Sequence, residues 1–253
     1  MFSETINSFS NAAIKKNNLL KQSFVGYFAL SMLAAIYVGF AVVLIISIGA
    51  PLFAAQSMWL KSLIGAAFAV ALTLVVFAGA ELFTSNNMIM TIGALDRKIS
   101  CLKALKLWLV CYLGNLAGGV LLAVVVDAAG LISKANFEFT AYLATYKVSA
   151  PFFKLFLKGV LCNVLVCLAI WSCQRTKSDA AKLGIIFWCL FAFVSSGFEH
   201  SIANMSLLSL GVISTGRITL LQLVHNLLPV SLGNLAGGAL VGAAYFFIAK
   251  RAD

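Results

Sequence analysis

The sequence predicts an all-α integral membrane protein, with six transmembrane helices in two inverted three-helix repeats. Its composition predicts the membrane class: hydrophobic residues make up 62% of the chain and charged residues 10%, against about half and about a quarter in soluble domains. The heptapeptide LGNLAGG predicts the duplication, because it occurs at residues 113–119 and again at 232–238. A segment repeated at a fixed offset is typical of a duplicated structural unit.

A second pair of segments has nearly the same offset. GAELFTSNNM (79–88) and SGFEHSIANM (196–205) contain Glu81 and Glu199, which lie 118 residues apart, whereas the heptapeptides lie 119 residues apart. Each repeat contains three expected spans, and an odd number of crossings places the second copy in the opposite orientation. The repeats are expected at 22–126 and 152–250.

The elements follow from the N-terminus onward. Residues 1–21 space apolar side chains between lysines and asparagines, which predicts a short amphipathic helix on the cytoplasmic surface. Runs of about 18 or more apolar residues then predict the spans. Because proline resists helix continuation, the first span is expected to close near Gly49 and Pro51, and the sixth to begin near Pro229. The six spans are expected near 24–49, 60–95, 104–126, 155–174, 183–213 and 229–249.

The second and fifth spans are expected to be interrupted. Each contains a glutamate, Glu81 or Glu199, among small and polar residues instead of a continuous apolar helix. Non-helical backbone persists at membrane depth only where protein buries it or where it lines an aqueous cavity. A carboxylate beside a break can accept hydrogen bonds from freed backbone N–H groups. We therefore favour a structural role for both glutamates, with proton transfer as the second interpretation.

Three asparagines are further candidates for stabilising the breaks. Asn115 and Asn234 belong to the two LGNLAGG segments and could cap or tie the broken segments from the neighbouring span. The glycines of these segments predict close packing of helices. Asn163 is an isolated polar residue of the fourth span, for which a position facing a pathway and an inter-helix hydrogen bond are equally open.

His200 is the single histidine expected at membrane depth. Because histidine titrates across the physiological pH range, His200 could hold a proton or lend one to a passing ion. Thr84, in the other break, is its expected hydrogen-bond partner. No second His, Cys or carboxylate has metal-ligand spacing relative to His200, so neither a metal site nor a cofactor is expected.

Lysine and arginine are distributed unevenly around the spans, with twelve of the 18 on one face. The positive-inside rule places that face and both termini in the cytoplasm of a multi-pass protein of the cell inner membrane. The formal charge of +10 thereby has a membrane explanation. Since no basic run carries interleaved aromatics, we expect no nucleic-acid partner.

Five segments carry a resemblance to a known family: GAELFTSNNM (79–88), GNLAGG (114–119), GVLCNVLVCLAIW (159–171), SGFEHSIANM (196–205) and PVSLGNLAGG (229–238). They resemble the formate/nitrite transporter family along essentially the whole chain. The resemblance implies an aquaporin-like protomer in which residues 1–253 form one transmembrane pore domain. It also implies a homopentamer in the lipid bilayer, with one pore per protomer. The implied substrates are small monovalent anions of weak acids: formate, nitrite, hydrosulfide, and sometimes lactate or acetate.

The resemblance also implies roles for individual residues, carried over by matching position. It makes Thr84 and His200 the central polar pair, and Lys147 a basic position near the outer vestibule that attracts anions. The remaining matches are Leu82 and Phe193 in the cytoplasmic constriction, Phe68 and Leu72 at apolar pore positions, Phe83 in the loop between, and Asn163 at a polar position. The SNNM and SIANMSLLSL stretches look most like the hydrosulfide-conducting branch.

Two alternatives stay open beside a hydrosulfide pore. The first is a formate or nitrite channel of the same family. The second is an intramembrane enzyme that uses Glu199 and His200. A hydrolase also needs a nucleophile and a partner that orients the base, and Ser201 is a poor candidate because adjacent helical residues point about 100° apart. We therefore favour a transport pore over an enzyme.

Overall fold

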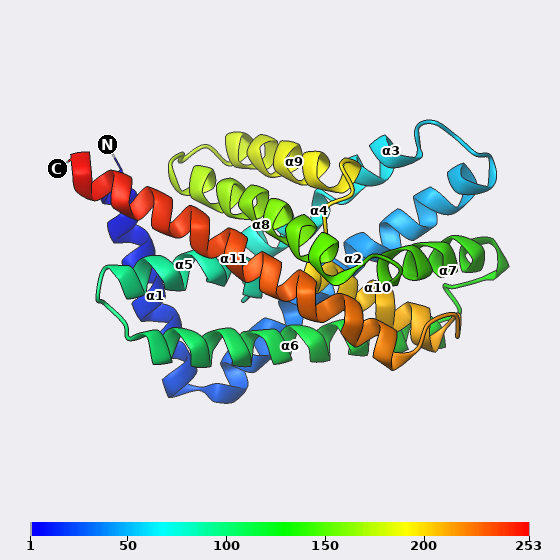
Figure 1. The fold of residues 1–253 in the computed structure, drawn as a ribbon, viewed down its shortest axis with the longest axis horizontal. Helices are drawn as coiled ribbons and strands as arrows, with labels where there is room; N and C mark the ends of the chain where they lie inside the picture. Colours follow the sequence, from blue (N-terminus) through cyan, green and yellow to red (C-terminus); the bar gives the residue numbers. More distant parts are fainter. Residues whose placement is uncertain (1, 253) are drawn as a thin grey trace.

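The computed structural model describes residues 2–252, so Met1 and Asp253 of the expected domain lie outside the described residues. The described chain is almost entirely helical and contains no strand. Most helices run along the long axis of the molecule, and both termini lie at the same end (Figure 1). Five helical stretches are long and apolar enough to cross a membrane. They are Phe24–Ala54, Leu60–Gly79, Cys101–Ala128, Phe152–Gln174 and Leu220–Lys250.

The chain forms eleven α-helices and one short π-helix within the described residues. The first half contains α1 (Ser3–Gln22), α2 (Phe24–Ala54), α3 (Leu60–Ala67), α4 (Val70–Leu74), the π-helix η1 (Val75–Gly79), α5 (Phe83–Leu95) and α6 (Cys101–Ala128). The second half contains α7 (Lys134–Val148), α8 (Phe152–Gln174), α9 (Asp179–Ser195), α10 (Ser201–Ile213) and α11 (Leu220–Ala252).

The structure confirms the helix predicted for residues 1–21, but its apolar face packs on protein. Ile6, Phe9, Ala13 and Leu20 of α1 are buried, and α1 contacts α5, α2 and α11. Figure 1 shows α1 crossing the end of the molecule where the termini lie. An apolar stripe predicts a helix but not what its apolar face packs against, because a membrane interface and a protein surface both bury such a stripe.

Two prolines do not mark helix ends where the sequence predicts them, so both predicted boundaries are wrong. α2 continues past Pro51 to Ala54, and α11 begins at Leu220 and runs through Pro229. Proline removes one backbone hydrogen bond, but helices packed in a membrane protein tolerate this loss because their neighbours satisfy the freed groups. α11 packs closely on α8 along this stretch.

The sequence pattern also misses α7, which lies in the connection between the two expected repeats. This helix packs against α2, α10 and α11. It carries charged residues and is too polar to be read as a span, yet its aromatic and apolar residues recur at helical spacing. These residues are Phe139, Tyr142, Leu143 and Tyr146.

Both predicted interruptions are present as short non-helical segments. In the first half η1 ends at Gly79 and α5 begins at Phe83; in the second α9 ends at Ser195 and α10 begins at Ser201. Gly79 (φ +81°) and Gly197 (φ +72°) adopt left-handed backbone. Glycine adopts this conformation without a steric penalty and commonly terminates helices, so it allows the chain to leave each helix abruptly.

The LGNLAGG glycines bring helices together as predicted. A Cβ atom on Gly118 of α6 would collide with the carbonyl oxygen of Met32 in α2. Gly237 of α11 has the same relation to the carbonyl oxygen of Val160 in α8. The repeated glycines therefore place α6 against α2 and α11 against α8, and these two pairs hold the segments that carry the breaks.

Candidate functional site

The two helix breaks bring Thr84 and His200 together. Thr84 lies in the first turn of α5, and its hydroxyl oxygen is 3.1 Å from Nε2 of His200, the residue that caps α10. Both side chains are buried. This hydrogen bond joins residues 116 positions apart, as the sequence predicts; the part that the pair plays in permeation stays a prediction.

The cap on α10 fixes which nitrogen of His200 carries the proton. Nδ1 accepts a hydrogen bond from the Ala203 backbone N–H at 3.2 Å. A ring nitrogen that accepts must be unprotonated, so the proton of the neutral imidazole lies on the other nitrogen. Nε2–H is therefore the donor that faces Thr84, and His200 presents a hydrogen-bond donor to the centre of the molecule.

Two asparagines hold the breaks through the same set of bonds. In α6, the Asn115 amide oxygen accepts from the Phe83 N–H (3.0 Å) while its NH₂ donates to the carbonyls of Glu81 (3.0 Å) and Ser31 (2.6 Å). An amide carries donors and an acceptor, so one side chain satisfies a carbonyl within the break and the first N–H of the helix that follows it. In α11, the Asn234 amide oxygen likewise accepts from the Ser201 N–H (2.9 Å), and its NH₂ donates to the carbonyls of Glu199 (3.0 Å) and Gly159 (2.8 Å).

Asn163 makes inter-helix hydrogen bonds. From α8, its NH₂ donates to the carbonyls of Thr84 (3.1 Å) and Asn234 (2.6 Å), and the side chain is fully buried. The bonds tie the start of α5 to α8 and α11. Of the two interpretations left open by the sequence, the structure supports the inter-helix bond.

The two glutamates are held by side chains instead of by the backbone N–H groups that the sequence suggested. Glu81 is 2.6 Å from the Lys16 ammonium and accepts hydrogen bonds from Tyr27 (3.0 Å) and Asn86 (2.9 Å). Burying an ionised carboxylate is costly unless a counter-charge and donors accompany it. The neutral asparagines satisfy the backbone, which leaves the carboxylates to pair with cations.

Glu199 has an equivalent environment in the second break. Its carboxylate is 2.8 Å from the Lys147 ammonium and accepts a hydrogen bond from Asn204 at 2.7 Å. Asn226 in turn accepts from the Asn204 amide (2.8 Å) and donates to the Lys147 carbonyl (2.7 Å). Lys147 is thus held at both its ammonium and its backbone.

Two cavities meet at His200. The larger, about 400 Å³, is walled by α7 and by the segment that joins α9 to α10. The smaller, about 10 Å³, is lined by apolar side chains including Leu72 and Leu82. Phe68, Phe193 and His200 line both cavities, so these three side chains separate them.

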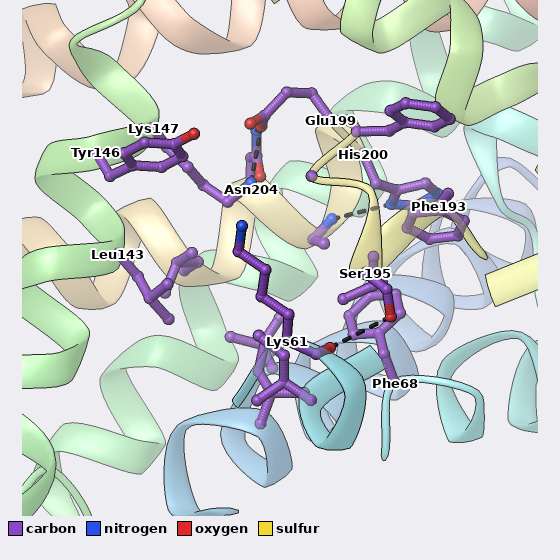
Figure 2. A pocket seen from close by; sticks show the side chains of 18 of the residues that line it. Lys61, Phe68, Leu143, Tyr146, Lys147, Phe193, Ser195, Glu199, His200 and Asn204 are labelled. Atoms are coloured by element: carbon purple, nitrogen blue, oxygen red, sulfur yellow. Dashed lines mark hydrogen bonds and ion pairs between the residues drawn. The ribbon is translucent and has the colours of Figure 1, made fainter. Parts of the chain in front are cut away.

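The partition between the cavities is made of rings in contact (Figure 2). The Phe193 ring stacks on the His200 imidazole with centres 5.9 Å apart and an interplanar angle of 16°. Phe68 meets Phe193 edge-on at 5.8 Å. Phe83 lies apart from this group, because its ring packs edge-on against Tyr112 of α6 at 5.1 Å. Of the apolar residues named from the sequence, Phe68, Leu72, Leu82 and Phe193 therefore line a cavity.

Comparison with known proteins identifies the fold. A family model described as "Formate/nitrite transporter" matches residues 3–248. The chain belongs to the formate/nitrite transporter family. It is 38% identical over 260 residues to the nitrite transporter NirC of Escherichia coli (strain K12), an alignment that covers 100% of this chain and 94% of NirC.

Solved structures of the formate/nitrite transporter family share the architecture. One described as "FNT family ion channel" has a TM-score of 0.91 and 38% identity, covering 98% of this chain and 99% of that one. Another, "Pentameric formate channel with formate bound", has a TM-score of 0.79 and 28% identity, covering 95% and 98%. These relatives are transporters and channels, so this family member is a membrane transport protein and not an enzyme.

Several residues around the breaks and the larger cavity were not assigned a role from the sequence. Lys16, Tyr27 and Asn226 hold the break carboxylates or their asparagines, and Lys61 and Lys158 line the larger cavity. No sequence signal marks Lys16, because it lies 65 residues from its partner. The helical spacing of aromatic residues in α7 is the one signal that could have placed that helix, and with it Lys147, against the cavity.

Proposed function

We propose that this protein conducts small monovalent anions of weak acids through a pore that passes the Thr84–His200 pair. The observation that carries this proposal is a buried polar pair at the junction of two cavities, in a family of transporters and channels. A ring of apolar side chains around such a pair excludes hydrated ions, because crossing it removes water from the ion.

The geometry supports a sequence of steps from the larger cavity inward. An anion in that cavity reaches the Phe68–Phe193 partition, where Nε2–H of His200 and the Thr84 hydroxyl offer hydrogen bonds. Between the apolar side chains the substrate crosses as the neutral acid or is held as an anion by these donors. Because Nδ1 of His200 already accepts the Ala203 N–H, His200 acts by donating a hydrogen bond more readily than by taking up a proton.

Hydrosulfide is the substrate we favour, and formate and nitrite are the alternatives. A cavity of about 10 Å³ beyond the partition holds about one water-sized body. Hydrosulfide has one heavy atom, whereas formate and nitrite each have three. The sequence similarity to a nitrite transporter and the structural similarity to a formate channel favour the alternatives, so the choice needs a direct comparison of fluxes.

We further propose six spans in two inverted repeats, with α3 to α5 forming the second crossing and α9 with α10 the fifth. The matching bonds of Asn115 and Asn234 across the two halves support the duplication. We place the protein in the cell inner membrane with both termini in the cytoplasm, and propose a homopentamer because the solved formate channel is described as pentameric.

The test is flux in proteoliposomes. Uptake of hydrosulfide, formate, nitrite and acetate is compared under matched gradients across pH, for the wild type and for His200→Asn. We expect saturable uptake of at least one of these anions in the wild type, reduced by the substitution. Absence of uptake for all four would overturn the pore proposal. A formate or nitrite flux above that of hydrosulfide would overturn only the choice of substrate.

A further inference from the structure

The larger cavity carries a surplus of positive charge. Three lysines line it, Lys61, Lys147 and Lys158, against a single acidic residue, Glu199. The Lys147 ammonium is 2.8 Å from the Glu199 carboxylate, so each cancels most of the field of the other. Lys61 and Lys158 make no ion pair with any residue between 2 and 252 whose side chain is described.

Both unpaired lysines are held beside the second break through their backbones. The Lys158 carbonyl accepts a hydrogen bond from the Glu199 N–H at 3.2 Å, and the Lys61 carbonyl accepts one from the Ser195 hydroxyl at 3.2 Å. The Lys158 ammonium also lies 5.5 Å from the centre of the Tyr146 ring. A cation–π contact of this length orients the ammonium but leaves its charge intact.

We propose that Lys61 and Lys158 form the anion-capture site of this cavity, and that Lys147 serves as the structural counter-ion of Glu199. Figure 2 shows the Lys61 side chain extending into the pocket. The ligands are small monovalent anions, and the proposal rests on the proposed function, which it deepens. The sequence assigned this attraction to Lys147, whose charge the structure shows to be paired.

The physical basis is the field of two unpaired cations inside a partly enclosed, largely apolar wall. A cleft lined by charge of one sign concentrates ions of the opposite sign and raises their association rates by about 10-fold to 1000-fold. Such attraction is screened by salt, since the Debye length falls from about 30 Å at 0.01 M to about 3 Å at 1 M. A short, buried ion pair is screened far less.

The experiment measures the initial uptake of hydrosulfide, isotope-labelled formate, nitrite and acetate into proteoliposomes at low and high ionic strength. The double variant Lys61→Met/Lys158→Met removes both charges, and Lys61→Arg/Lys158→Arg retains them. Lys154→Met is the matched control, because Lys154 is an exposed residue of α8 outside the cavity. Size-exclusion chromatography in detergent establishes that each variant keeps the wild-type assembly.

We expect the methionine double variant to lose about tenfold of its flux at low ionic strength and to approach the wild type at high ionic strength. The arginine variant and Lys154→Met should follow the wild type. Lys147→Met should lower flux by the same factor at both ionic strengths. Unchanged low-salt flux in the methionine variant, or an equal loss at both salts, would overturn the proposal. Absence of wild-type flux for all four anions would instead overturn the proposed function.

Discussion

Removing the Lys147 ammonium should destabilise the second break far more than removing a surface charge. In Lys147→Met the Glu199 carboxylate, whose side chain is 2% exposed, loses its cation at 2.8 Å and keeps the Asn204 amide. Breaking a buried ion pair by removing one partner costs about 3–5 kcal/mol, because the remaining charge is buried without compensation. Removing both charges avoids most of that cost.

We therefore predict that substitutions at Lys147 and Glu199 are coupled in their effect on stability. Lys147→Met alone should cost about 3–5 kcal/mol, and Lys147→Met/Glu199→Gln should recover most of it, because a neutral glutamine can still accept the Asn204 hydrogen bond. The exposed pair Lys182–Asp179, at 2.9 Å, is the control. A surface pair of this kind contributes about 0–1 kcal/mol.

The assay measures the thermal midpoint of the detergent-solubilised assembly, which is monitored through the loss of its size-exclusion peak. Since each kcal/mol shifts the midpoint of a chain of this size by roughly 2–4 °C, Lys147→Met should lower it by about 10 °C. The double variant should lie within a few degrees of the wild type. A single variant as stable as the wild type, or a double variant no better than the single, would refute the reasoning that Lys147 neutralises a buried charge.

Three further predictions concern the packing and the centre of the pore. Gly118→Val should abolish the assembled protein, because the added side chain collides with the Met32 carbonyl; expression followed by size-exclusion chromatography checks this, and a normal assembly would contradict it. Phe193→Ala should admit hydrated ions such as chloride, measured as a new chloride leak, because Phe193 is part of the partition between the cavities. His200→Leu should reduce substrate flux by about 10²-fold or more in stopped-flow uptake, since it removes the donor facing Thr84; full activity would rule out that role.

The sequence predicted the frame of the site well, because duplicated local segments specify it. The helix breaks, the asparagines of the heptapeptides and the Thr84–His200 hydrogen bond all follow from comparing two copies of one pattern. The partners of the glutamates could not be predicted in this way. Lys16 lies on α1 and Lys147 on α7, outside the segments repeated in sequence, and only the packed chain brings them to Glu81 and Glu199.

The proline boundaries failed for a related reason. Pro51 and Pro229 are strong local signals, and local signals describe an isolated helix better than one surrounded by packed neighbours. α11 continues through Pro229 while packed along α8. The sequence pattern correctly predicted contacts that the two copies share. It failed for the boundaries of single helices, because tertiary packing overrode the local effect of proline.

The equivalent contacts show where the two copies diverge. Leu82 and His200 are separated by the same 118 residues as the glutamates, and each is the N-cap of the helix after a break. Leu82 makes no side-chain cap bond, whereas His200 accepts the Ala203 N–H and turns its other nitrogen to Thr84. Since the asparagine clamps are the same in both copies, this position can change from apolar to polar without disturbing the frame. We therefore propose that the chemistry of permeation depends on positions at which the two copies differ, with His200 supplying a donor at the junction of the two cavities.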